Sequence, residues 1–140
     1  MNPPATERDD APRYWTYAEI TLIRAAALIH LVGMAVGLIV PTKLTVPFGI
    51  IVGEPATFLR ASFAIYGVIG VGLLRVVNVE RPRGRLLVET VGLAKIALFA
   101  VFVADVVARR QPATAAIALL GELAFGVALF RASRRVQRTR

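Results

Sequence analysis

The chain has 140 residues, of which 56% are hydrophobic, and its mean hydropathy is +0.65. A soluble domain of this length carries more charge and less apolar bulk, so the composition argues against one. The chain has no cysteine, which excludes disulfides, thiolate catalysis and thiolate metal sites. The net charge of +8 is also typical of nucleic-acid binding, but basic residues beside apolar segments are ordinary topology signals, so we expect no nucleic-acid partner.

We predict that residues 1–18 form a flexible tail. Residues 1–13 combine prolines with acidic residues, where a signal peptide has a basic start and an apolar core. Trp15 and Tyr17 suit the membrane–water interface, where amphipathic rings collect. Thr16 and Glu19 have the spacing of a capping box, which predicts that a helix begins just before residue 20.

Four apolar segments are long enough to cross about 30 Å of hydrocarbon, which takes roughly 20 residues. We predict spans over residues 20–40, 56–77, 86–107 and 113–130. Pro41 ends the first span, while Pro55 and Pro112 precede the second and the fourth. The predicted fold is an all-α membrane protein, a four-transmembrane-helix bundle over residues 19–132, followed by a basic tail over residues 133–140.

The three connections differ in character. Residues 41–55 are themselves apolar, so we expect this loop to lie along the membrane surface or to dip into it. Residues 78–85 are polar and basic. Residues 109–111 form a very short connection, which predicts an antiparallel hairpin of the third and fourth spans.

Lysine and arginine counts predict the orientation. With the N-terminus inside, the inner segments hold ten basic residues and the outer segments hold three, namely Lys43, Arg109 and Arg110. The positive-inside rule therefore places both termini in the cytoplasm. We expect a multi-pass protein of the bacterial cytoplasmic membrane.

Ionisable and polar residues interrupt all four spans. The fixed helix rise of about 1.5 Å per residue converts sequence position into depth, and one polar residue per span falls near the midplane: His30, Tyr66, Lys95 and Glu122. Small residues allow close helix packing in membranes, and those that we expect to serve this purpose are Gly33, Gly37, Gly67 and Gly70.

Four further charges suggest two pairs at other depths, Arg24 with Glu89 and Arg60 with Asp105, although both arginines could instead extend toward the interface. For Lys95 and Glu122 a structural ion pair, a ligand or proton site, and a contact to another subunit stay open. His30 is either a packing residue or a ligand. It is the only histidine, so a bis-histidine haem within one chain is excluded, and we expect no metal or cofactor.

The arrangement resembles the DoxX-like group of small four-helix bacterial membrane proteins. The similarity lies in Gly33 and Gly37, in the proline-containing loop after them, in residues 60–72 (RASFAIYGVIGVG) and in Glu122. It covers roughly residues 20–132 and implies the same membrane fold and a link to membrane redox systems, but no catalytic residue carries over. Small multidrug transporters are also four-helix proteins of this length, but their essential carboxylate lies within the first span, where this chain has none.

Two hypotheses about function follow. The first is an accessory or structural subunit of a larger membrane complex, because the loops are short and no cofactor motif or nucleophile constellation is present. Its partners would be the lipid bilayer and either other membrane-protein subunits or further copies of the chain. The second is a small proton-coupled transporter or a quinone-associated redox component that uses the midplane cluster. The accessory-subunit hypothesis favours a protein that is not an enzyme.

Overall fold

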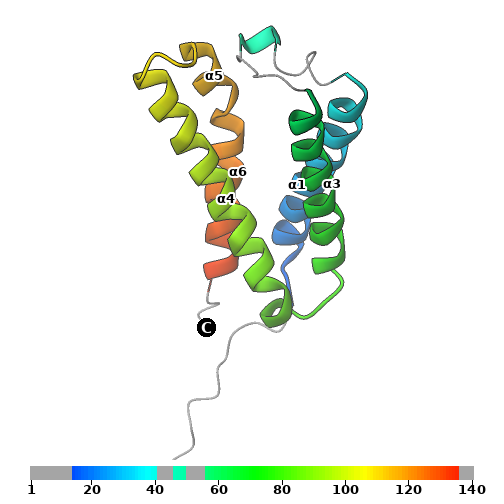
Figure 1. Ribbon diagram of the computed structural model, residues 1–140. Helices are drawn as coiled ribbons and strands as arrows, with labels where there is room; N and C mark the ends of the chain where they lie inside the picture. Colours follow the sequence, from blue (N-terminus) through cyan, green and yellow to red (C-terminus); the bar gives the residue numbers. More distant parts are fainter. Residues whose placement is uncertain (1–13, 41–45, 50–55, 136–140) are drawn as a thin grey trace, which may run out of the picture.

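The computed structural model describes residues 14–40, 46–49 and 56–135, and every regular element in these ranges is helical (Figure 1). The elements are α1 (Tyr17–Ile39), a short 3₁₀ helix η1 (Val46–Phe48), α3 (Ala56–Val76), α4 (Arg81–Val107), α5 (Ala113–Ala118) and α6 (Leu120–Arg134). Within the described ranges, three helical stretches are long and apolar enough to cross a membrane: α1, α4 and the continuous run of α5 and α6. These findings support a helical membrane protein. Most of the predicted tails and of loop 41–55 lie outside the described residues.

Residues 16–18, which we predicted to belong to the tail, form the N-cap and the first turn of α1. The capping box is confirmed, because the Thr16 amide donates to the Glu19 carboxylate at 2.8 Å and the Glu19 amide donates to the Thr16 hydroxyl at 3.3 Å. Trp15 is only 6% exposed and belongs to the apolar core, so its ring packs against the protein itself. Tyr17 is exposed.

Helix α4 begins at Arg81, five residues before the start that hydropathy predicts. Pro82 lies in its first turn, where the missing N–H of proline costs no helical hydrogen bond. Residues 81–85 are therefore helical, although we expected them to belong to a polar connection. This shift gives Arg81, Gly84 and Val88 one common buried face.

The helices form two pairs, α1 with α3 and α4 with α6 (Figure 1). The second pair is the predicted antiparallel hairpin. The two pairs converge at the end where α1 begins and α6 ends, which we call the converging end, and they spread apart toward α5 and η1. An apolar cluster that includes Ile23, Leu73, Val88 and Leu129 joins the pairs near the converging end.

Glycines allow close backbone approach within each pair. A Cβ atom added at Gly70 of α3 would lie 3.0 Å from the Ala27 carbonyl oxygen of α1, and one at Gly37 would overlap the Phe63 ring. A Cβ at Gly67 would overlap the Met34 side chain, whereas Gly33 has ordinary contact room. The packing role of these glycines in a membrane stays a prediction. In the second pair, a Cβ at Gly92 would lie 2.9 Å from the Gly126 carbonyl oxygen, a contact that we did not expect.

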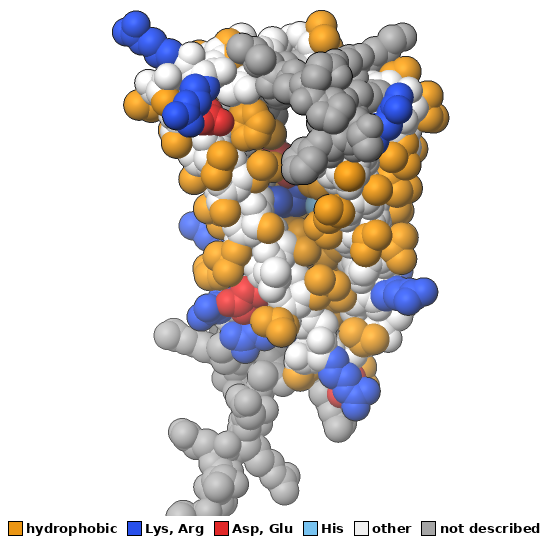
Figure 2. Space-filling model, viewed as in Figure 1, with side chains coloured by type: hydrophobic (Ala, Val, Ile, Leu, Met, Phe, Trp, Pro, Cys, Tyr) orange, Lys and Arg blue, Asp and Glu red, His pale blue; other side chains and the backbone are white. Residues whose placement is uncertain are grey.

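The outer surface of the bundle is strongly apolar (Figure 2). Large hydrophobic side chains that are more than half exposed lie on every long helix, for example Leu28, Val68, Val101 and Leu120. In water such a surface would be unfavourable, while in a bilayer it faces lipid.

Candidate functional site

One polar residue from each of the four long helices meets the others in the middle of the bundle. The Lys95 ammonium of α4 pairs with the Glu122 carboxylate of α6 and donates to the Tyr66 hydroxyl of α3 at 3.2 Å. The Tyr66 ring stacks on the His30 imidazole of α1, with ring centroids 4.1 Å apart and an interplanar angle of 28°. The four residues that we predicted at one depth therefore lie together, and Lys95 approaches Glu122, while their position at the membrane midplane stays a prediction. We call these four residues the central cluster.

The central cluster is well shielded from the surroundings. His30 is 1% exposed, Lys95 is 4% exposed and the Glu122 side chain is 18% exposed. His30 Nδ1 lies 2.6 Å from the Ala26 carbonyl oxygen in the preceding turn. Because a carbonyl oxygen only accepts, Nδ1 carries the proton, and Nε2 of a neutral imidazole is then an acceptor.

Helix packing explains why these side chains meet. Gly70 brings the α3 backbone against α1 at His30, and Tyr66, one turn earlier on α3, then reaches the imidazole ring. On the other side, a Cβ atom at Gly126 would lie 2.9 Å from the Lys95 Cβ. Glu122 is one turn before Gly126, so the same close approach brings its carboxylate to the ammonium group.

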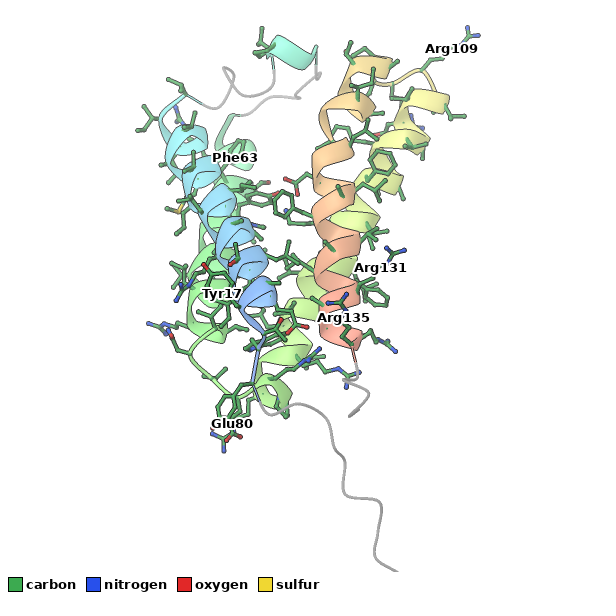
Figure 3. All side chains as sticks on the ribbon, turned by 180° about the vertical axis from the view of Figure 1, so that it is seen from behind. Tyr17, Phe63, Glu80, Arg109, Arg131 and Arg135 are labelled. Atoms are coloured by element: carbon green, nitrogen blue, oxygen red, sulfur yellow. The ribbon has the colours of Figure 1, made fainter. Side chains whose placement is uncertain are left out.

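A cavity of about 280 Å³ lies beside the central cluster. His30, Tyr66 and Lys95 form its polar wall, and the rest of the lining is mainly apolar and comes from α3 and α4. Among the α4 lining residues, Leu87, Thr90 and Ala94 are exposed at the helix surface, so the cavity opens sideways. Figure 2 shows a hollow between the helix pairs with acidic and basic side chains in its depth, and Figure 3 shows, from behind, that side chains of both pairs point into the space between them.

A second buried ion pair lies at the converging end, and sequence reasoning missed it. Arg81 Nη2 is 3.2 Å from Glu19 Oε1, and both side chains are 4% exposed. The same nitrogen donates to the Ala132 carbonyl oxygen at 2.6 Å, and the guanidinium lies over the Trp15 ring at 5.4 Å. This arrangement, which we call the basal pair, connects the starts of α1 and α4 with the end of α6. The sequence could have indicated that Arg81 is buried, because Arg81 shares one helix face with Gly84 and Val88. This face exists only if the helix begins at Arg81, and we predicted a later start.

Both further charge pairs predicted from depth are wrong. Glu89 pairs with Arg134 of α6 at 2.7 Å and with Arg85 at 3.8 Å, whereas Arg24 is exposed on α1. Because α4 packs mainly along α6, the Glu89 carboxylate lies beside an arginine of α6.

Asp105 pairs with Arg110, at 3.7 Å, and not with Arg60. Asp105 lies in the last turn of α4 and Arg60 near the start of α3, and these two helix ends lie where the helix pairs have spread apart (Figure 1).

The part of the chain that the structure describes has no group of three or more His, Asp or Glu side chains that could hold a metal ion. Comparisons with protein-family models, with curated proteins and with solved structures give no match. The resemblance to the DoxX-like group stays a prediction.

Proposed function

We propose that the chain is a four-span membrane protein with both termini in the cytoplasm, and that it binds a small molecule in the cavity beside the central cluster. As the fourth span we propose α3, which has 21 residues and packs along α1. The converging end supports the orientation because it gathers arginines, among them Arg131 and Arg135 (Figure 3), while Arg109 lies at the opposite end.

The single observation that carries the binding function is the cavity wall. Three residues of the central cluster line an otherwise apolar space that opens sideways. Ionisable residues in the interior of a membrane protein are costly and usually mark a ligand or ion pathway, and an apolar pocket with a few convergent polar groups is the usual form of a small-molecule site. A binding protein or carrier for a membrane-soluble compound fits this geometry.

An accessory subunit of a larger complex is the second candidate. It is favoured by the observation that the buried charges pair with one another, Lys95 with Glu122 and Glu19 with Arg81. Such internal pairing is what a purely structural polar core requires.

Native mass spectrometry of the protein, purified gently from its own membrane, tests both candidates. Binding predicts a small-molecule mass that is retained by the wild type and lost when Ala94→Phe fills the cavity. Ala100→Phe is the matched control, because Ala100 is also exposed on α4 but does not line the cavity. Stoichiometric partner proteins, together with no mass that depends on Ala94, would overturn the binding function in favour of the accessory subunit.

A further inference from the structure

The polar wall of the cavity limits the charge of what can bind there. The Lys95 ammonium is already balanced by the Glu122 carboxylate, so the site is close to neutral overall. A charged ligand would add an uncompensated charge to a shielded apolar space, which is unfavourable. The cavity therefore favours a neutral molecule.

The hydrogen-bonding groups of the cavity wall limit which polar group the ligand can carry. An ammonium group has three N–H donors, and Glu122 and Tyr66 accept two of those of Lys95. Lys95 lines the cavity, so its third N–H can serve an acceptor oxygen there. Hydrogen bonds from charged donors are the stronger ones, which makes a carbonyl oxygen the best-matched group.

The volume and shape of the cavity limit the apolar part of the ligand. An apolar cavity of roughly 150 Å³ holds benzene, so about 280 Å³ holds one substituted ring. The stacked rings of His30 and Tyr66 both line the space and provide an aromatic surface for a flat ring. The sideways opening past Leu87, Thr90 and Ala94 allows entry from the surrounding hydrocarbon.

We infer that the cavity binds a small neutral molecule with one flat ring, whose carbonyl oxygen accepts a hydrogen bond from Lys95. This inference rests on the proposed binding function and names its ligand class. The apolar remainder of the molecule then lies against the side chains of α3 and α4, and the Lys95–Glu122 pair acts as a neutral hydrogen-bond donor.

Three probes of similar shape test the class on the purified full-length protein in detergent: acetophenone, ethylbenzene and benzoate. The readout is the rise in Tm with probe concentration, which reports binding to the folded state. We expect acetophenone to bind about tenfold more tightly than ethylbenzene, as one hydrogen bond from a charged donor provides. Benzoate should give no shift. Ethylbenzene partitions into detergent more strongly than the other probes, which lowers its free concentration. Each affinity is therefore calculated from the measured concentration of free probe.

Variants locate the binding. Ala94→Phe should abolish the acetophenone shift, while the matched control Ala100→Phe should retain it. The double variant Lys95→Met with Glu122→Leu should bind acetophenone and ethylbenzene equally. If the wild type itself binds both equally, or binds benzoate best, the ligand class is wrong, although a shift lost in Ala94→Phe would still support the cavity. If no probe gives a shift that depends on Ala94, both the class and the proposed binding function fail.

Discussion

Lys95 is the residue on which the central cluster depends, because it contacts both Tyr66 of one helix pair and Glu122 of the other. Placing an ammonium group in a shielded interior is unfavourable unless a carboxylate and further acceptors surround it. An ion pair of this kind adds little stability compared with two apolar residues, but losing one partner is costly because the other charge is left alone.

We predict that Glu122→Gln destabilises the protein by about 3–5 kcal/mol, the usual cost of orphaning a buried charge. Lys95→Met combined with Glu122→Leu should recover much of this loss. Thermal unfolding in detergent measures both. Asp105→Asn is the control, since its pair with Arg110 is largely exposed and should contribute little. If each single variant at Lys95 and Glu122 were as stable as the wild type, the two would not form a buried pair.

At the scale of the elements, backbone contact between helices decides how each pair packs. Helices α4 and α6 touch through Gly92 and Gly126, whereas a Cβ atom added at Gly121 of α6 would meet no side chain and no other helix within 4 Å. Glycine is required only where two helix backbones touch, as at Gly92. Elsewhere in a helix alanine stabilises the helix more than glycine does.

Gly92→Ala should destabilise the protein by about 1–3 kcal/mol, the usual cost of overpacking, because its Cβ would meet the Phe130 amide nitrogen at 2.8 Å and backbone atoms there cannot easily move. Gly121→Ala makes the same chemical change in open space and should be neutral or stabilising by up to about 1 kcal/mol. Tm values of the two variants, measured side by side, check this. Equal losses in both would show that α4 and α6 are not in backbone contact at Gly92.

The basal pair ties three helix ends together, so its arginine should matter far more than its neighbours. Arg81→Met leaves the Glu19 carboxylate without its counter-ion and the Ala132 carbonyl without its donor, and we expect a loss of about 3–5 kcal/mol. Arg83→Met removes an equal charge from an exposed position in the same turn and should change Tm little. A similar small effect from both would mean that Arg81 acts only as a topology signal.

For the whole molecule, the uneven distribution of arginines predicts the orientation in the membrane. Because the chain has no cysteine, single cysteines can be placed without background. Ala5→Cys and Gln137→Cys should resist an impermeant thiol reagent added to intact cells, while Arg109→Cys should react. Labelling of residue 5 or residue 137 from outside would refute the proposed cytoplasmic termini.

Local physics made several features predictable from the sequence alone. The hydropathy runs, the capping box at Thr16 and the prolines place the helices, because these depend on neighbouring residues only. The central cluster was predictable because a fixed rise per residue turns sequence position into depth, and His30, Tyr66, Lys95 and Glu122 are polar groups at one depth.

The depth of a residue does not say which helix lies beside it. Only the tertiary structure decided which charged residues pair with each other. Glu89 has arginines of several helices near its level, and the packing of α4 on α6 through Gly92 selects Arg134 over Arg24. Arg81 is charged and lies beside a proline, so only its burial against Trp15 and Ala132 distinguishes it from Arg83. The cavity, too, exists because two tightly packed helix pairs meet at one end and diverge, a shape that depends on contacts between residues distant in the chain.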